Sequence, residues 1–259
     1  MTSILKIAGL AVGFAMAAIG VANAQQVKMG IAAEPYPPFS TPDASGNWTG
    51  WEIEIGKAIC AKAGLDCVVT PVAWDGIIPA LTSEKIDMIV ASMSITAERE
   101  KTIDFSDKYY NTPTVIVGAK DADGQATPEG MAGKIIGVQI ATIHEAYVRK
   151  HFTKAAEIKV YQTQDEANQD LVAGRIDATE ADGLALDAFL KSPDGAACCK
   201  AIGNVAPDLE ILGPGAGVGL RKGDTELKDK INAAIKGIRD DGTYAAISKT
   251  YFDFDIFGG

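Results

Sequence analysis

Arg99 has the sequence surroundings expected of a side chain that binds a carboxylate. It follows Ser92 and Ser94, two hydroxyl residues that come directly after a buried apolar run. A guanidinium group offers a planar fork for two parallel hydrogen bonds to a carboxylate, and hydroxyl and helix-start N–H groups can complete the set of donors. The other interpretation is a surface ion pair between Arg99 and Glu100 or Asp104. Spacing alone leaves both open.

Other residues have the chemistry to bind cationic and apolar groups. Asp182 follows a second buried run, where it could accept hydrogen bonds from an ammonium group or act as an ordinary turn residue before Gly183. Tyr36 and Trp74 could flank a ligand side chain with their aromatic faces. Glu52 could neutralise a distal cation, or it could lie solvated on the surface.

The elements that must position these residues alternate between strand and helix, which is typical of an α/β fold. The pattern predicts strands at 27–32, 67–71, 86–91, 135–139, 158–161, 176–179 and 217–220. It predicts helices at 52–62, 142–151, 164–173, 225–239 and 243–250, with Asp75 capping a short helix that runs to Leu81 and Thr96 capping the helix that carries Arg99.

Two short segments of the chain resemble each other. Residues 83–87 read Ser-Glu-Lys-Ile-Asp, and residues 173–177 read Ala-Gly-Arg-Ile-Asp; each precedes a buried strand that leads to polar residues. The match indicates two similar lobes that present polar groups at the carboxyl ends of their strands. Open α/β sheets bind ligands there, and a cleft between two lobes is a natural site.

The N-terminal residues 1–24 have the three parts of a secretory signal peptide: one Lys, a short apolar run and an Ala-Asn-Ala site. An uncleaved membrane anchor is the alternative, but the run is short and rich in Ala and Gly. Cleavage would leave Gln25 first, with no Cys to carry a lipid. We therefore expect an exported, soluble protein.

The cysteines fit an oxidising compartment. Cys60 and Cys67 lie at a predicted helix end and strand start, where a local disulfide is expected and a zinc site is the poorer alternative because no His is near. Adjacent Cys198 and Cys199 could pair, stay reduced or bridge two chains. The formal net charge of −10 argues against nucleic-acid binding. No metal or cofactor motif is present in the sequence.

Several longer motifs make a resemblance specific. The segments are 36–40 (Tyr-Pro-Pro-Phe-Ser), 74–81 (Trp-Asp-Gly-Ile-Ile-Pro-Ala-Leu), 91–99 (Ala-Ser-Met-Ser-Ile-Thr-Ala-Glu-Arg), 104–110 (Asp-Phe-Ser-Asp-Lys-Tyr-Tyr) and 241–244 (Asp-Gly-Thr-Tyr). In this order they resemble the family 3 polar amino-acid solute-binding proteins of ABC importers, especially the lysine/arginine/ornithine- and histidine-binding proteins.

The resemblance implies a two-lobed type II periplasmic-binding-protein fold whose lobes are joined by two hinge strands. Lobe I would comprise residues 25–111 and 213–259, and lobe II residues 112–212. The protein would be a periplasmic monomer without a cofactor. It would close over a free basic amino acid and deliver it to an inner-membrane permease.

The resemblance also assigns roles to individual residues. Arg99 would bind the α-carboxylate with Ser94 and a backbone N–H near Ile143; Asp182 would bind the α-ammonium with Ser94 and the Ser92 carbonyl; Tyr36 and Trp74 would flank the side chain, and Glu52 would face its distal cation. Further candidates for ligand contact are Glu34, Gln139, Thr142 and His144.

The chain departs from the basic-amino-acid pattern at some of these positions. Ala91 stands where a Ser is usual, Trp74 replaces a Phe, Ile143 replaces a Thr and His144 replaces a Gln, while the acidic residue before Tyr36 is shifted to Glu34. An opine is therefore an alternative ligand. A dehydratase on the same fold is the alternative of another class, with His144, Glu34 or Glu180 as its acid or base. We expect a binding protein and not an enzyme.

Overall fold

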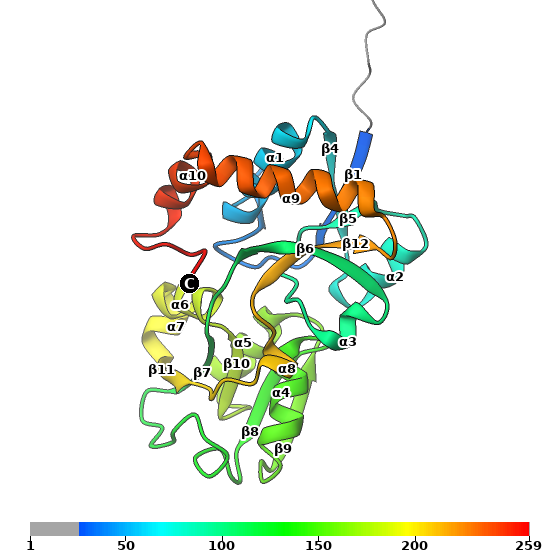
Figure 1. The fold of residues 1–259 in the computed structure, drawn as a ribbon. Helices are drawn as coiled ribbons and strands as arrows, with labels where there is room; N and C mark the ends of the chain where they lie inside the picture. The colour runs from blue at the N-terminus through cyan, green and yellow to red at the C-terminus, as the bar shows by residue number, and fades with distance from the viewer. Residues whose placement is uncertain (1–25, 259) are drawn as a thin grey trace, which may run out of the picture.

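The computed structural model describes residues 26–258, which form two α/β lobes, one above the other in Figure 1. The predicted signal peptide, residues 1–24, lies outside the described residues. Within the described range, the helices are all too short or too polar to span a membrane. The type II fold expected from the sequence is the one observed.

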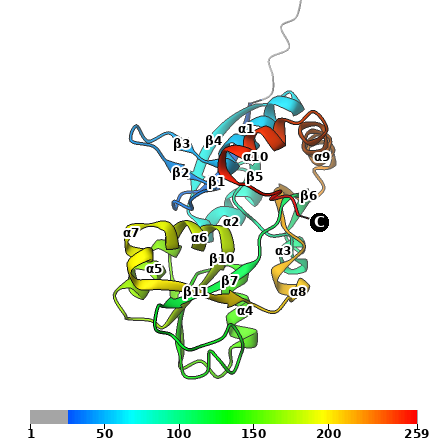
Figure 2. The same ribbon diagram turned by 90° about the vertical axis from the view of Figure 1, so that its left-hand side faces the viewer.

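Lobe I is built on a mixed five-stranded sheet in the order β4-β1-β5-β12-β6. Its strands are β1 (Gln26–Ala32), β4 (Asp66–Val72), β5 (Met88–Ile89), β6 (Ile103–Tyr110) and β12 (Ala216–Arg221). Its helices are α1 (Trp51–Ala63), α2 (Ile77–Thr82), α3 (Ala97–Glu100), α9 (Thr225–Asp240) and α10 (Thr243–Tyr251). A hairpin of β2 (Thr41–Pro42) and β3 (Trp48–Thr49) projects from this lobe in Figure 2.

Lobe II is built on a second five-stranded sheet, in the order β11-β7-β10-β8-β9. Its strands are β7 (Thr114–Ala119), β8 (Ile135–Gln139), β9 (Glu157–Tyr161), β10 (Ala178–Asp182) and β11 (Cys199–Asn204). Its helices are α4 (Ile143–His151), α5 (Gln164–Val172), α6 (Gly183–Lys191) and α7 (Pro193–Cys198). The chain enters between β6 and β7 and returns between β11 and β12, past the short helix α8 (Leu209–Leu212).

The two sheets have the same plan. In each, three strands run parallel (β4, β1 and β5; β9, β8 and β10), a fourth runs antiparallel to them (β12; β7), and the fifth is antiparallel to the fourth (β6; β11). The repeated segments occupy equivalent places before β5 and β10. Asp87 accepts a hydrogen bond from the backbone N–H of Lys28 at 2.9 Å, and Asp177 accepts one from that of Ile135 at 2.7 Å. The similarity found in the sequence is thus a similarity of structure.

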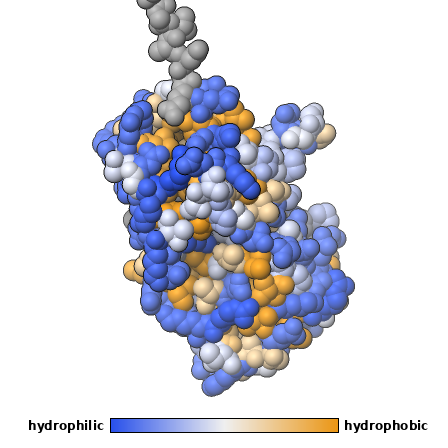
Figure 3. Space-filling view, turned by 90° about the vertical axis from the view of Figure 1, so that its right-hand side faces the viewer, coloured by the Kyte–Doolittle hydropathy of each residue, from blue (hydrophilic) through white to orange (hydrophobic). Residues whose placement is uncertain are grey.

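The core of lobe I includes an aromatic cluster behind the cleft. The Trp51 ring meets those of Tyr110 and Tyr244 edge to face, with centroids 5.3 and 5.9 Å apart, and its indole N–H donates to Ser248 at 3.0 Å. The hydrogen bond to Ser248 satisfies the polar N–H of this buried indole. By contrast, the face shown in Figure 3 is mostly hydrophilic, with separate apolar areas.

Both cysteine pairs are bonded in the structure. The disulfide predicted between Cys60 and Cys67 joins the end of α1 to β4. The fate of Cys198 and Cys199 was open from the sequence, and the structure pairs them with each other.

Two local predictions were wrong. Asp75 does not cap a helix: it lies inside a 3₁₀ turn at Trp74–Gly76, and α2 begins after Gly76 without a side-chain cap. The strand predicted at 86–91 is regular only over Met88–Ile89. The chain beyond β5 is already bending toward the cleft, and Ser92 has a positive φ of 53°. The predicted Thr96 cap is present, with its hydroxyl accepting from the Arg99 N–H at 3.3 Å.

Candidate ligand-binding site

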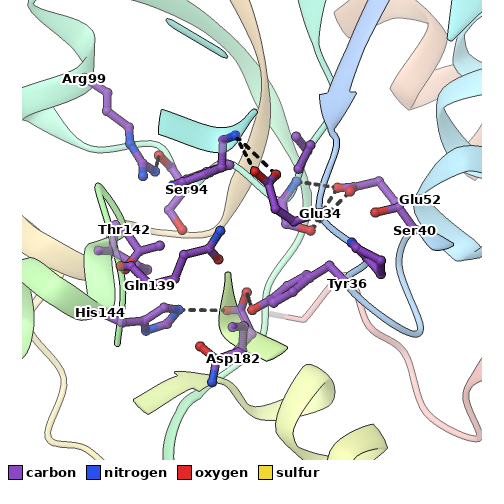
Figure 4. A pocket seen from close by; sticks show the side chains of 17 residues that line it. Glu34, Tyr36, Ser40, Glu52, Ser94, Arg99, Gln139, Thr142, His144 and Asp182 are labelled. Atoms are coloured by element: carbon purple, nitrogen blue, oxygen red, sulfur yellow. Dashed lines mark hydrogen bonds and ion pairs between the residues drawn. The ribbon is translucent and has the colours of Figure 1, made fainter. Parts of the chain in front are cut away.

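A single pocket between the lobes gathers the candidate residues from distant parts of the chain. The residues predicted from the sequence that line it are Glu34, Tyr36, Glu52, Trp74, Ala91, Ser92, Ser94, Arg99, Gln139, Thr142, Ile143, His144 and Asp182. Figure 4 shows several of them converging from both lobes. Ala32, Pro35, Ser40 and Gln164 also line the pocket and were not predicted.

Arg99 is held in the cleft and does not pair on the surface. Its Nη1 donates to the Ser94 carbonyl at 2.9 Å, and Nη2 donates to the Ala141 carbonyl of lobe II at 3.4 Å. The guanidinium also lies 5.4 Å from the centre of the Trp74 ring. Burial lowers the pKa of Arg99 to about 10, so the group remains charged at neutral pH. The surface alternative is further excluded for Asp104, which pairs with Lys222.

Asp182 is the last residue of β10, and it lines the pocket from lobe II. The Tyr36 hydroxyl of lobe I donates to its Oδ2 at 2.9 Å, and the Nε2 of His144 lies 3.9 Å from its Oδ1. Burial raises the pKa of Asp182 to about 6, and the Tyr36 hydrogen bond and the charge of Arg99 partly offset that rise. An ammonium group in the pocket would favour the ionised carboxylate further.

Glu52 is fully buried at the second position of α1, yet it lines the pocket. Its carboxylate accepts from the Ser92 N–H at 2.6 Å, from the Ser92 hydroxyl at 3.2 Å and from the Tyr109 hydroxyl. Burial raises the pKa of Glu52 to about 7, while these donors act in the opposite direction. The carboxyl group therefore stabilises the turn that carries Ser92.

Glu34 and Trp74 meet at the same end of the pocket. Both carboxylate oxygens of Glu34 lie 3.2 Å from the Trp74 backbone nitrogen, so this acidic group is fixed beside the ring. The indole Nε1 of Trp74 is buried without a hydrogen-bond partner among the described residues. This end of the pocket thus combines the aromatic face of Trp74 with the carboxylate of Glu34.

The start of α4 borders the pocket from lobe II. Thr142 caps the helix: its hydroxyl accepts from the Glu145 N–H at 3.1 Å and donates to the Gln139 carbonyl at 2.7 Å. Ile143 and His144 are the first two helical residues, whose N–H groups have no partner within a helix. A helix start of this kind favours a negatively charged group.

The residues that sequence reasoning missed carry weak local signals. Ser40 closes the Tyr-Pro-Pro-Phe segment and is buried, and Gln164 begins α5, where its amide donates to Thr179 and Asn168. Tyr109, the partner of Glu52, belongs to a recognised motif but is 57 positions away from Glu52 along the chain. Only the folded chain places these residues together.

The pocket can bind a zwitterion with an additional positive group. It presents a guanidinium and a helix start to an anion, one carboxylate to a nearby ammonium, and two further carboxyl groups, of which that of Glu34 lies beside Trp74. No group of three or more metal-ligating side chains is found within residues 26–258. A site of this kind, enclosed between two similar lobes, defines a two-lobed receptor for a small polar solute.

The chain belongs to the bacterial extracellular solute-binding proteins, family 3, whose family model matches residues 27–254. It is 41% identical over 234 residues to the L-arginine-binding protein of Pseudomonas aeruginosa, covering 90% of each chain. It is 40% identical over 235 residues to the histidine-binding periplasmic protein of Salmonella typhimurium, again covering 90% of each.

Solved structures show the same relationship. An ancestral arginine-binding protein bound to arginine superposes with a TM-score of 0.79 at 36% identity, covering 88% of this chain and 98% of the other. An ancestral amino acid-binding protein described as a precursor of cyclohexadienyl dehydratase gives a TM-score of 0.77 at 31% identity, covering 88% and 95%.

Proposed function

We propose that this protein is a periplasmic receptor that encloses a free basic amino acid and delivers it to an ABC importer. The observation that carries the proposal is the combination of one guanidinium and three carboxyl groups in a single pocket. Arg99 and Asp182 would bind the two α-substituents, while Glu34, beside Trp74, and Glu52 supply further carboxyl groups to the pocket lining. The arginine- and histidine-binding relatives support the same class of ligand.

The α-carboxylate would bind Arg99, the Ser94 hydroxyl and the N–H groups near Ile143. The guanidinium is already oriented by the Ser94 carbonyl and the Trp74 ring. Orientation before binding reduces the entropy lost when the ligand is bound.

The α-ammonium would bind Asp182, assisted by Ser94 and the Ser92 carbonyl. Because Tyr36 already donates to one oxygen of Asp182, the ammonium would share or replace this contact. Tyr36 and Trp74 would flank the ligand's side chain, with Ala91 providing an apolar wall in place of a hydroxyl.

The distal cation would lie near Glu52 and Glu34. The oxygens of Glu52 already accept from Ser92 and Tyr109, so we propose that Glu34 shares this role with Glu52. The raised pKa of Glu52 implies that a cationic ligand would displace its remaining proton near neutral pH.

We further propose that the chain is exported through the signal peptide at residues 1–24 and acts as a monomer. The relatives named periplasmic support this location. We propose no catalytic role. The dehydratase precursor that resembles this chain is itself described as an amino acid-binding protein.

The test is isothermal titration calorimetry on ligand-stripped protein with arginine, lysine, ornithine, histidine, glutamine, glutamate and an opine. Tight binding of a cationic amino acid with no response to glutamate is the expected result. Binding of an opine alone would retain the receptor class and move specificity to Trp74 and Ala91. No binding across the panel would contradict the proposal.

A further inference from the structure

Behind the pocket, the side chain of Glu180 is fully buried and lacks partners. Its side chain is 0% exposed, and neither carboxyl oxygen has a hydrogen-bond partner among residues 26–258. The Nδ1 atom of His144 is likewise buried and unpartnered, and it lies 3.9 Å from Oε1 of Glu180. A carboxyl group left without partners in an apolar environment costs free energy, so its retention calls for a role.

His144 stands between two carboxyl groups. Its Nδ1 faces Glu180, and its Nε2 lies 3.9 Å from Oδ1 of Asp182. Figure 4 shows the imidazole pointing toward Asp182 while Tyr36 approaches the same carboxylate from the other side. Glu180 and Asp182 are two residues apart on β10, and alternate residues of a strand share one face of the sheet.

Lobe I provides an internal comparison for Glu180. Met88 and Ile89 pair with β1 as Ala178 and Thr179 pair with β8, so the next position along is Val90 in lobe I and Glu180 in lobe II. Val90 is fully buried in the apolar core. The sheet plan itself therefore places no requirement for a carboxyl group at this position.

We propose, on the basis of the amino-acid-binding function above, that Glu180 and His144 form a positioning pair for Asp182. Both N···O separations are 3.9 Å, which exceeds hydrogen-bond length, so the pair requires these side chains to close by about 1 Å. Glu180 then keeps its proton and donates it in a hydrogen bond to Nδ1 of His144. This fixes the neutral imidazole with its hydrogen on Nε2, which donates to Oδ1 of Asp182. The carboxylate that receives the ligand's ammonium is then held from two sides, by His144 and by Tyr36.

The electrostatics of the site agree with this arrangement of protons. The charged or titratable groups that face His144 are Glu180 and Asp182 from β10 and Arg99 from lobe I. Burial raises the pKa of Glu180 well above its usual value. Burial, with a contribution from Arg99, lowers the pKa of His144 to about 3. His144 is therefore neutral at pH 7, and burial favours the protonated form of Glu180.

The first test needs no ligand. The chain contains two histidines, His144 and His151, so nitrogen NMR of labelled protein gives two imidazole spin systems, and His151→Gln assigns them. We expect His144 to remain the neutral tautomer with its hydrogen on Nε2 from roughly pH 5 to 8, a range in which an unperturbed imidazole titrates. A hydrogen on Nδ1, or an imidazolium in this range, would overturn the pair.

The second test uses two variants of one residue. In Glu180→Gln the amide N–H can still donate to Nδ1, whereas Glu180→Val installs the residue of lobe I and removes the donor. We expect the Val variant to raise the Kd for the bound amino acid on the order of 10-fold and the Gln variant to stay within about 3-fold. His151→Gln, on the same helix, should bind as the unmodified protein does.

The two tests separate the pair from the receptor function. Equal affinity in both Glu180 variants and the unmodified protein, or equal loss in both variants, would contradict a positioning role. If the unmodified protein binds no amino acid on the calorimetric panel, the receptor function fails, and the tautomer of His144 still decides whether the pair exists.

Discussion

The two lobes share one sheet plan but differ in how they support the residues at the cleft. In lobe I the second residue of α1, Glu52, accepts hydrogen bonds from Ser92. In lobe II the second residue of α4, His144, faces Asp182. The helix carries the acid in one lobe, and the strand end carries it in the other. The same arrangement of strands and helices therefore presents the uncharged turn that carries Ser92 from lobe I and the Asp182 carboxylate from lobe II.

The difference continues one layer deeper. Val90 packs in the apolar core of lobe I, whereas Glu180 at the equivalent place lies buried behind His144. Comparison of the two lobes thus distinguishes positions required by the sheet from positions required by the binding site. Positions that serve the sheet, such as Asp87 and Asp177, keep their residue type and their hydrogen bond, and positions that serve the site diverge.

The largest effect is expected from placing the carboxyl group of lobe II into lobe I. Val90→Glu would bury an acid with no imidazole opposite it, and we expect the free energy of unfolding to fall by roughly 3 kcal/mol or more. Chemical denaturation measures the change. Val68→Glu is the matched control, because Val68 is 42% exposed and should tolerate the same substitution. Equal stability of both variants would contradict the prediction, because lobe I would then tolerate a buried acid at position 90 as lobe II does at position 180.

Removing the cation that lobe I contributes should nearly abolish binding. Arg99→Ala leaves the ligand's α-carboxylate unpaired in a desolvated cleft, at an expected loss of roughly 2–5 kcal/mol of binding free energy. Calorimetry with the best ligand of the panel measures it. Arg149→Ala, which removes an exposed guanidinium paired with Glu145 on α4, should leave affinity unchanged. Normal binding by the Arg99 variant would mean that another group receives the carboxylate.

Acidic pH should weaken binding through the carboxylate of lobe II. The pKa of Asp182 is raised to about 6, and an ammonium ligand requires the ionised form. Affinity should therefore be constant well above pH 6 and fall by up to tenfold per unit below it, since a proton must be displaced. A calorimetric pH series with a neutral amino acid measures this. The Asp182→Asn variant should bind more weakly, and its affinity should no longer change with pH. An unchanged pH profile in that variant would mean that another group causes the pH dependence.

A smaller effect should distinguish the repeated segments before β5 and β10. Both have a residue with positive φ, Glu84 at 61° in lobe I and Gly174 at 67° in lobe II. Glycine adopts this conformation without strain. We expect Glu84→Gly to stabilise the protein by about 0.5–1 kcal/mol and Gly174→Ala to destabilise it by about 1 kcal/mol. Denaturant midpoints compare the two, and a loss of stability in the first variant would contradict the equivalence.

Much of this architecture could be predicted from sequence because its signals are local. The alternation of strands and helices, the Thr96 cap and the repeated Ile-Asp segments each depend on residues within one element. The polar groups of the cleft were found for a related reason. They follow buried strands, and the carboxyl ends of neighbouring strands meet at one edge of a sheet.

Contacts between distant segments could not be predicted in this way. Glu180 lies in β10, all of whose residues are buried, so neither face of that strand gives an alternating signal. The hydrogen bond from Tyr109 to Glu52 depends on how the start of α1 packs against the end of β6. Asp75 had the composition of a helix cap, but the chain forms a 3₁₀ turn there that presents Trp74 to the pocket.

The position of β12 bears on the order in which the chain can fold. Lobe II uses consecutive strands, β7 to β11, so its sheet can form as soon as those residues have been synthesised. Lobe I cannot complete its sheet in this way, because β12 lies between β5 and β6 and is made only after all of lobe II. We therefore expect the sheet of nascent lobe I to remain incomplete between β5 and β6 until β12 has been synthesised. The order of biosynthesis makes the earlier-made lobe the later one to mature.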